Sequence, residues 1–124
     1  MPLTFSIDHE ARTVLSTATG ILSCDDLLGH LLSKKAQKLF SYSELFDVRN
    51  VTLDLSISDL HKIAAEARLA MGDDKPERVA VVTTSSFIRG LAHTYAALTV
   101  GENPNFSVFQ HIDEARQWVY DQKN

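Results

Sequence analysis

The sequence predicts an α/β fold in which helices pack on a mixed five-stranded sheet. Residues 3–8 alternate apolar and polar side chains, which is the period of a β-strand. Residues 79–82 (Val-Ala-Val-Val) are continuously apolar, as in a parallel strand that is covered on both faces. Expected helices and strands alternate along most of the chain, so right-handed crossovers would make the later strands parallel. The chain, residues 1–124, has the length of a single domain with the order β-β-α-β-α-β-α-β-α.

An antiparallel hairpin is expected to open the sheet and to make it mixed. Residues 13–19 are rich in β-branched side chains and follow the first strand after a polar connector. Gly20 is expected to end this second strand. The third strand is expected at residues 44–48, with residues 49–50 leaving it, and the fourth at residues 78–84.

Two helices are expected to begin with a capping box, in which a serine and an acidic residue three positions later satisfy backbone amides reciprocally. Ser23 with Asp26 opens the first helix, and Ser56 with Asp59 opens the second, which Gly72 would end. Both helices carry an apolar stripe at helical spacing that we expect to be buried. The first stripe contains Leu27, Leu28, Leu31, Leu32 and Leu39. The second contains Ile57, Leu60, Ile63, Ala64, Ala67 and Met71.

Two further helices and a last strand complete the expected order. The third helix is expected at residues 86–99, and the fourth from residue 112 to about residue 122, with acidic residues in its first turn. A loop at residues 101–105 precedes a short strand at residues 106–109. The inward side chains of the third helix are expected to be Phe87, Ile88, Leu91, Tyr95 and Leu98.

The charge and the cysteine content exclude several classes of protein. With 16 acidic and 12 basic side chains the formal net charge is −4, which argues against a nucleic-acid partner. The densest basic cluster is Lys34, Lys35 and Lys38, which we interpret as a solvated helix face. The lone cysteine, Cys24, cannot form an internal disulfide. No apolar run is long enough for a signal peptide or a membrane span, so we expect a cytoplasmic protein.

Four segments have the order and spacing of a known bacterial family. They are Gly20–Leu22, Phe46–Arg49, Arg78–Val82 and the set Phe109, Glu114, Ala115 and Trp118. In these segments the chain resembles the SpoIIAA-like family, which is related to the STAS domains of anti-sigma-factor antagonists. The resemblance covers essentially the whole chain and implies a SpoIIAA-like, STAS-like domain with a regulatory or protein-binding role. It also implies an outline link to the lipid-handling SEC14-type fold.

The segment after the third expected strand departs from the phosphorylation motif of the antagonists. They carry Asp-Ser-Ser-Gly there, and the second serine is phosphorylated. In an alignment without gaps, Asp47 takes the place of an aspartate in the preceding strand, and Ile57 falls on the phosphorylated serine. Because isoleucine cannot accept a phosphate, the resemblance implies a domain without the usual partner switch. Ser56 and Ser58 are candidate regulatory phosphorylation sites if the register slips, and helix-capping residues otherwise.

A run of hydroxyl side chains lies where the fourth strand is expected to meet the third helix. Thr83, Thr84, Ser85 and Ser86 are candidate ligand- or anion-binding residues. Ligands favour the carboxyl ends of parallel strands, and a helix start offers unpaired amides. The alternative is simple helix capping. No Gly-rich phosphate loop and no Gly-x-Ser-x-Gly elbow accompanies these residues, so we expect neither a nucleotide site nor a serine nucleophile.

Several side chains outside this hydroxyl run are of types found in interaction, redox or metal sites. Asp47 and Arg49 lie two apart at a strand end and share one face, where they could pair with each other or meet a partner. Trp118 is a candidate interface anchor, or else a core residue. Cys24 is expected to be packed or idle, because the two aspartates beside it oppose a thiolate. The five histidines are scattered, so we expect surface positions and no metal site.

These observations favour a non-enzymatic protein-interaction or regulatory module that works as a homodimer or with a protein partner. Such a module is expected to expose an apolar patch and to have no cavity near the strand ends. The alternative is a carrier or sensor of a small apolar or lipid-like ligand, with an internal pocket roofed by the third and fourth helices. We expect no enzyme, because the titratable groups are scattered, and no cofactor.

Overall fold

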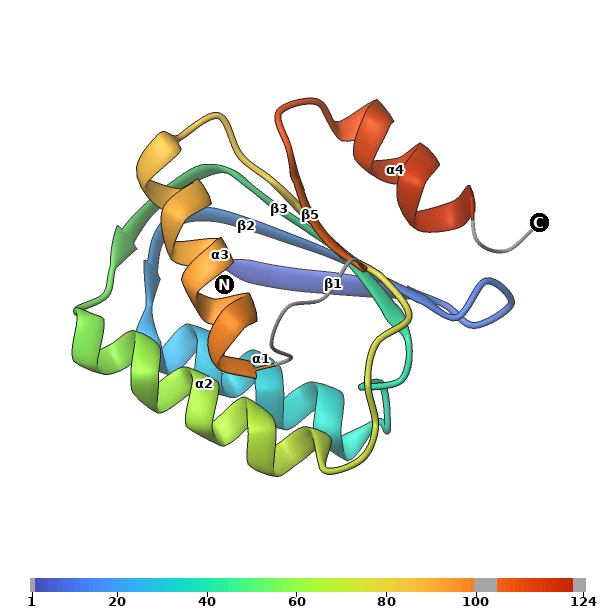
Figure 1. Ribbon diagram of the computed structural model, residues 1–124, viewed down its shortest axis with the longest axis horizontal. Helices are drawn as coiled ribbons and strands as arrows, with labels where there is room; N and C mark the ends of the chain where they lie inside the picture. Colours follow the sequence, from blue (N-terminus) through green and yellow to red (C-terminus); the bar gives the residue numbers. More distant parts are fainter. Residues whose placement is uncertain (1, 100–104, 122–124) are drawn as a thin grey trace.

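The computed structural model describes residues 2–99 and 105–121, and it has the α/β fold that the sequence predicts (Figure 1). The strands are β1 (Leu3–Asp8), β2 (Thr13–Ser23), β3 (Ser43–Asp54), β4 (Val79–Val82) and β5 (Phe106–Phe109). The helices are α1 (Cys24–Ala36), α2 (Ile57–Met71), α3 (Ser86–Thr99) and α4 (Ile112–Asp121). Among the described residues, no helix has the length and apolar character needed to cross a membrane.

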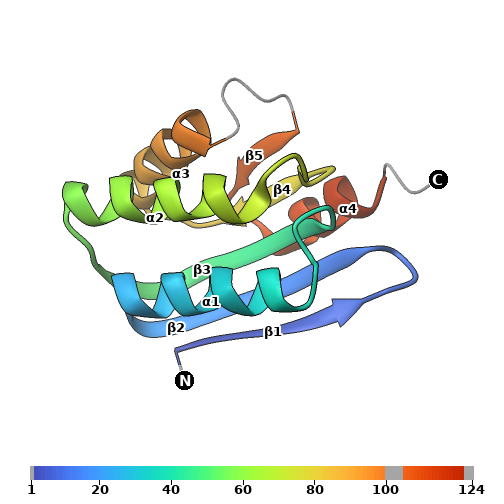
Figure 2. The ribbon, with the colours of Figure 1, turned by 90° about the horizontal axis from the view of Figure 1, so that it is seen from below.

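The sheet is mixed, and its strand order follows the chain. β1 pairs antiparallel with β2, and β2, β3, β4 and β5 then pair in parallel. Each crossover therefore places the next strand beside the previous one. The helices α1, α2 and α3 cover one face of the sheet, and α4 covers the other (Figures 1 and 2). The domain thus has three layers, with the sheet in the middle.

The short strand β4 is covered on both faces, as its apolar sequence predicts. Val81 packs with Val48 on the face that α1, α2 and α3 cover. Ala80 and Val82 are fully buried on the other face, where they pack against Val119 of α4. The sheet therefore lies between the apolar cluster around Val81 and the one around Ala80 and Val82.

β2 and β3 are longer than predicted, because they extend together past the expected stops. Gly20 does not end β2 but pairs with Val51 in β3 while β2 runs on. Its φ of +75° and a shift of register between Thr17 and Thr19 mark an irregularity at which the strand bends. Asn50 does not leave β3 either, since it pairs with Thr19. Gly20 therefore allows β2 to bend and does not end the strand.

The buried helix stripes are narrower than predicted. Leu32, Ile57 and Phe87 are 68%, 64% and 67% exposed, so the prediction that they are buried is wrong. Ile57 and Phe87 lie in the first turns of α2 and α3, outside the packed part of each helix. Leu32 lies on the outer side of α1, because His30 and Lys34 take inner positions of that helix.

Some element ends differ from the predicted ones. α1 ends at Ala36, so Leu39 is buried in the connection after the helix and not in its stripe. β4 begins and ends inside the predicted range of residues 78–84. The predicted loop at residues 101–105 lies, apart from its last residue, outside the described residues, as does the predicted end of the last helix.

Both predicted capping boxes are present. Ser23 Oγ accepts a hydrogen bond from the Asp26 N–H at 3.3 Å, and the Asp26 carboxylate accepts one from the Ser23 N–H at 3.0 Å. Ser56 and Asp59 do the same at the start of α2, at 3.0 Å in both directions. Gly72 follows α2 with a φ of +56°, which confirms it as the stop. Local hydrogen bonds therefore fix where α1 and α2 begin.

We predict that Ser56→Ala lowers the free energy of unfolding by about 1 kcal/mol, because the first turn of α2 loses a capping hydrogen bond. Ser58 is exposed in the same turn and provides the matched control. Ser58→Ala should change stability by less than roughly 0.5 kcal/mol. Urea unfolding followed by circular dichroism measures both variants, and equal losses would contradict the role of Ser56 as the cap.

Candidate ligand-binding site

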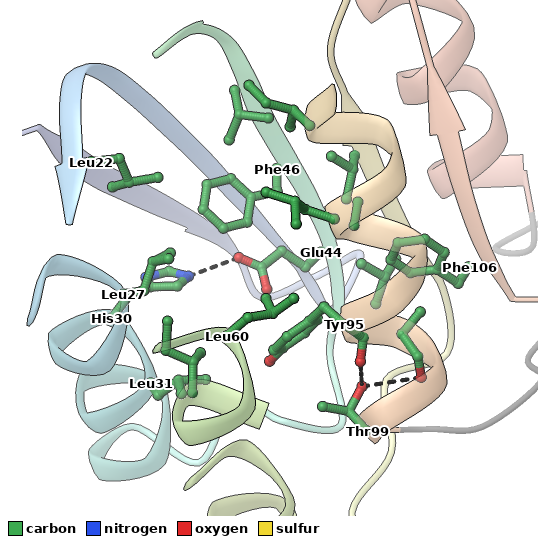
Figure 3. Close-up of a pocket in the computed structure, with 18 of the residues that line it drawn as sticks. Leu22, Leu27, His30, Leu31, Glu44, Phe46, Leu60, Tyr95, Thr99 and Phe106 are labelled. Carbon is green, nitrogen blue, oxygen red and sulfur yellow. Dashed lines mark hydrogen bonds and ion pairs between the residues drawn. The ribbon is translucent and has the colours of Figure 1, made fainter. Parts of the chain in front are cut away.

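A cavity of about 180 Å³ lies between the sheet and the helices α1, α2 and α3 (Figure 3). Strands from β2 to β5 supply its floor, and the three helices supply its roof. Most of its wall is apolar and includes Leu22, Phe46, Ile63, Val81, Ile88 and Phe106. The polar residues in the wall are His30, Lys34, Glu44, Tyr95 and Thr99. An apolar cavity with a few polar groups is typical of a small-molecule site.

Glu44 is the centre of a buried polar cluster in this wall. Lys34 Nζ lies 2.5 Å from Glu44 Oε1. His30 Nε2 lies 2.8 Å from Glu44 Oε2 (Figure 3). Ser16 Oγ donates a third hydrogen bond, to Oε2, at 2.7 Å. All four residues are less than a tenth exposed. The carboxylate is therefore enclosed by donors from α1 and β2.

Regular spacing brings these residues together. His30 and Lys34 are four apart on α1, so their side chains lie on one face of the helix. Glu44 and Phe46 are two apart on β3, so they point to the same side of the sheet. Ser16 lies opposite Phe46 on the adjacent strand β2. Once α1 lies on this face of the sheet, its two polar side chains meet Glu44.

The cluster keeps Glu44 ionised. Burial alone would raise the pKa of this carboxyl, but the Lys34 charge and the hydrogen bond from His30 outweigh burial and hold the pKa well below its usual range. Tyr95, on α3, is half-buried, and desolvation of its phenol together with the charge of Glu44 raises the pKa of that phenol. The phenol therefore stays protonated at ordinary pH, beside a fixed carboxylate and its counterion.

This chemistry suits binding better than proton transfer. A carboxylate with a low pKa and three hydrogen-bond donors is a weak base, because its negative charge is already stabilised. The charge of Lys34 balances it. In residues 2–99 and 105–121, no group of three or more His, Cys, Asp and Glu side chains is arranged to hold a metal ion. The site can therefore hold an apolar molecule in contact with the polar cluster around Glu44.

The three-layer architecture matches a known crystal structure. It is that of an uncharacterised protein of the DUF3478 family from Shewanella loihica PV-4, which has a SpoIIAA-like fold. The TM-score is 0.65 and the sequence identity 18%, over 94% of this chain and 93% of that chain. This chain has a SpoIIAA-like fold. No protein-family model matches the sequence, and no curated protein is similar to it in sequence. The fold that the sequence resemblance implies is confirmed, and a shared fold does not by itself assign a function.

Two predictions for polar residues of this SpoIIAA-like domain are wrong. Lys34 does not lie on a solvated face with Lys35 and Lys38, because it is buried and paired with Glu44. His30 is not a surface histidine. Both residues fall within the leucine stripe of α1, whose inner face lies against the sheet. Their helical spacing with those leucines is the sequence signal that would have placed them inside.

The four hydroxyl residues after β4 do not line the cavity. Thr83 is buried, and its Oγ1 accepts a hydrogen bond from the Ser85 N–H at 3.1 Å. Ser85 Oγ accepts one from the Ile88 N–H at 3.2 Å at the start of α3. Thr84 and Ser86 are exposed. These contacts are capping contacts, and anion binding at this helix start stays a prediction.

The candidate interaction residues lie on the α4 side of the sheet. Asp47 is two residues after Leu45, which packs against α4. Arg49 donates to both carboxylate oxygens of Asp47, at 2.9 and 2.8 Å, and this pairing lowers the pKa of Asp47 despite its burial. Trp118 is half-buried, with the Arg78 guanidinium 4.8 Å from the centre of its ring. Asp47 and Arg49 therefore pair with each other, and contact with a partner stays a prediction.

The two remaining candidates lie at helix starts. Ser56 caps α2 and Ser58 is exposed in its first turn, so phosphorylation of either serine stays a prediction. Cys24 is the first residue of α1. Burial and then the charge of Asp59 raise the pKa of its thiol. A raised thiol pKa agrees with the expected unreactive cysteine.

We predict that Glu44→Gln lowers the free energy of unfolding by roughly 3–5 kcal/mol, because it leaves Lys34 as an uncompensated buried charge. Adding Lys34→Met removes that charge and should recover most of the loss. Glu10→Gln, at an exposed position of the turn between β1 and β2, is the control and should change stability little. Urea unfolding compares the variants. A Glu44→Gln protein as stable as the Glu10→Gln protein would contradict the buried ion pair.

Proposed function

We propose that this SpoIIAA-like domain binds a small apolar molecule in the cavity under α1, α2 and α3 and acts as its carrier or sensor. The observation that carries the proposal is the cavity of about 180 Å³ with an apolar wall and one buried polar cluster. Protein interiors are normally close-packed, and an unfilled space costs stability. A ligand that fills this space would regain the missing contacts.

The size of the cavity indicates the size of the ligand. An engineered protein cavity of roughly 150 Å³, lined by leucine, isoleucine and phenylalanine, binds benzene. The cavity of this domain is slightly larger, at about 180 Å³, and has a wall of the same kind. A ring with a short substituent would therefore fit.

The position of the cavity favours ligand binding over the predicted interaction module. That module would have no cavity near the strand ends, but the cavity wall includes Leu22 and Leu53, near the carboxyl ends of β2 and β3. The roof differs from the expected one. It is formed by α1, α2 and α3, because α4 packs on the opposite face through Ala115 and Val119.

We expect native mass spectrometry of gently purified protein to show an adduct that dissociates as a small apolar molecule. Ala92→Phe should abolish the adduct, because Ala92 lines the cavity and a phenyl ring there would fill it. Ala97→Phe adds the same ring at an exposed position of α3, and it should leave the adduct in place.

Circular dichroism and the Tm show whether both alanine variants fold. If the wild-type protein carries no adduct and no small aromatic compound raises its Tm, the proposed ligand binding is wrong. Retention of the adduct in a folded Ala92→Phe protein would place the ligand outside this cavity.

A homodimer is the second candidate function, and a surface hollow between α1 and α2 favours it. Leu32 and Leu69 are 68% and 77% exposed, and both line this hollow. Lys35, Lys62 and Glu66 line it as well. A two-fold interface must be self-complementary. Two apolar side chains beside charges of both signs meet that requirement, so a second copy of this chain is the proposed partner.

Sedimentation velocity over a range of concentrations tests the dimer. We expect the wild-type protein to dimerise as concentration rises, and the double variant Leu32→Ser, Leu69→Ser to stay monomeric. Ile21→Ser removes an equally exposed apolar side chain, 67% exposed, at the end of β2, and should leave the dimer intact. A wild-type protein that is monomeric at every concentration would rule out this candidate.

A further inference from the structure

We infer that the cavity selects a neutral, ring-sized molecule with one hydrogen-bond acceptor, and that Lys34 Nζ recognises this acceptor. The inference rests on the proposed function, because it names the class of ligand that the same cavity takes. It follows from how the donors and acceptors of the polar cluster are used.

Lys34 has donors to spare. Its side chain is 11% exposed, and the residue lines the cavity. An ammonium group has three N–H donors. Within the described part of the chain, Nζ makes one hydrogen bond, to Glu44 Oε1, and otherwise lies 4.9 Å from the centre of the Phe40 ring. Two N–H donors of Nζ are therefore left over, and an acceptor on a ligand in the cavity could take one of them.

The cluster is closed to ions of either sign. Glu44 already accepts hydrogen bonds from Ser16, His30 and Lys34, which leaves little capacity for a ligand ammonium. The charge of Lys34 is already balanced by Glu44. A ligand carboxylate would therefore be a second buried anion beside the first, and buried like charges repel strongly. A carbonyl or ether oxygen can accept from Nζ without adding a charge.

Three compounds of similar shape separate these cases: acetophenone, which has a carbonyl acceptor, cumene, which has none, and benzoate, which is an anion. Isothermal titration calorimetry on wild-type protein should give acetophenone at least a tenfold lower Kd than benzoate, because the benzoate carboxylate would be a second buried anion beside Glu44. In protein labelled with ¹⁵N at lysine Nζ, acetophenone should shift the Lys34 signal and cumene should not.

The double variant Lys34→Met, Glu44→Gln isolates the part played by Nζ. It removes both charges together, so no buried ion is left unpaired. The ratio of acetophenone affinity to cumene affinity should fall about tenfold relative to wild type. Lys75→Met, at an exposed position in the connection after α2 that lines neither the cavity nor the hollow, should leave the ratio unchanged.

The outcomes separate this inference from the proposed function. If none of the three compounds binds wild-type protein, the inference fails, and the native mass spectrum then decides whether the proposed function fails with it. If acetophenone and cumene bind but the Lys34 signal is unmoved, or the ratio is unchanged in the folded double variant, the inference fails and the proposed function stands. If benzoate binds more tightly than acetophenone and cumene, the inference also fails and the proposed function stands. If the double variant does not fold, the ¹⁵N signals of the wild-type protein decide.

Discussion

The pairing of the buried Glu44 carboxylate with its donors is the interaction on which the face of the sheet under α1, α2 and α3 depends. A carboxylate can leave water only when donors surround it. Here the donors come from α1 and from β2, the strand next to β3. The helix must therefore lie on the sheet with His30 and Lys34 facing inward. Any slide of α1 along the sheet would separate Lys34 and His30 from Glu44, their ion-pair partner among the described residues.

The position of α1 in turn decides how the other two helices of this face are placed. α2 packs beside α1 through Leu31, Ile63 and Ala67, and Tyr95 of α3 joins the same cluster. These helices therefore form a layer that is held together by its own apolar contacts. A second cluster, around Val48 and Val81, lies against the sheet. The cavity is the space that remains between the helix layer and the sheet, with Glu44 as the polar link across it.

The sequence predicts the element order and the helix starts well, because local spacing determines both. The serine–aspartate pairs that start α1 and α2 act within one turn, and the apolar run of β4 needs no partner to be recognised. The cavity depends on contacts between distant residues. Lys34 and Glu44 are ten apart and meet only after α1 folds back on β3. Gly20 is ambiguous for the same reason, because only pairing with Val51 shows that the strand continues.

The two faces of the sheet differ in how completely the side chains on them are packed. On the α4 face, Ala115 and Val119 are fully buried against Ala80 and Val82. On the opposite face the packing is incomplete. The sheet lies between the cavity and the α4 cluster, so a substitution in the helices that roof the cavity does not touch the α4 cluster. Such an architecture would let the proposed ligand preference diverge between descendants of one ancestor while the cluster under α4 preserves the fold.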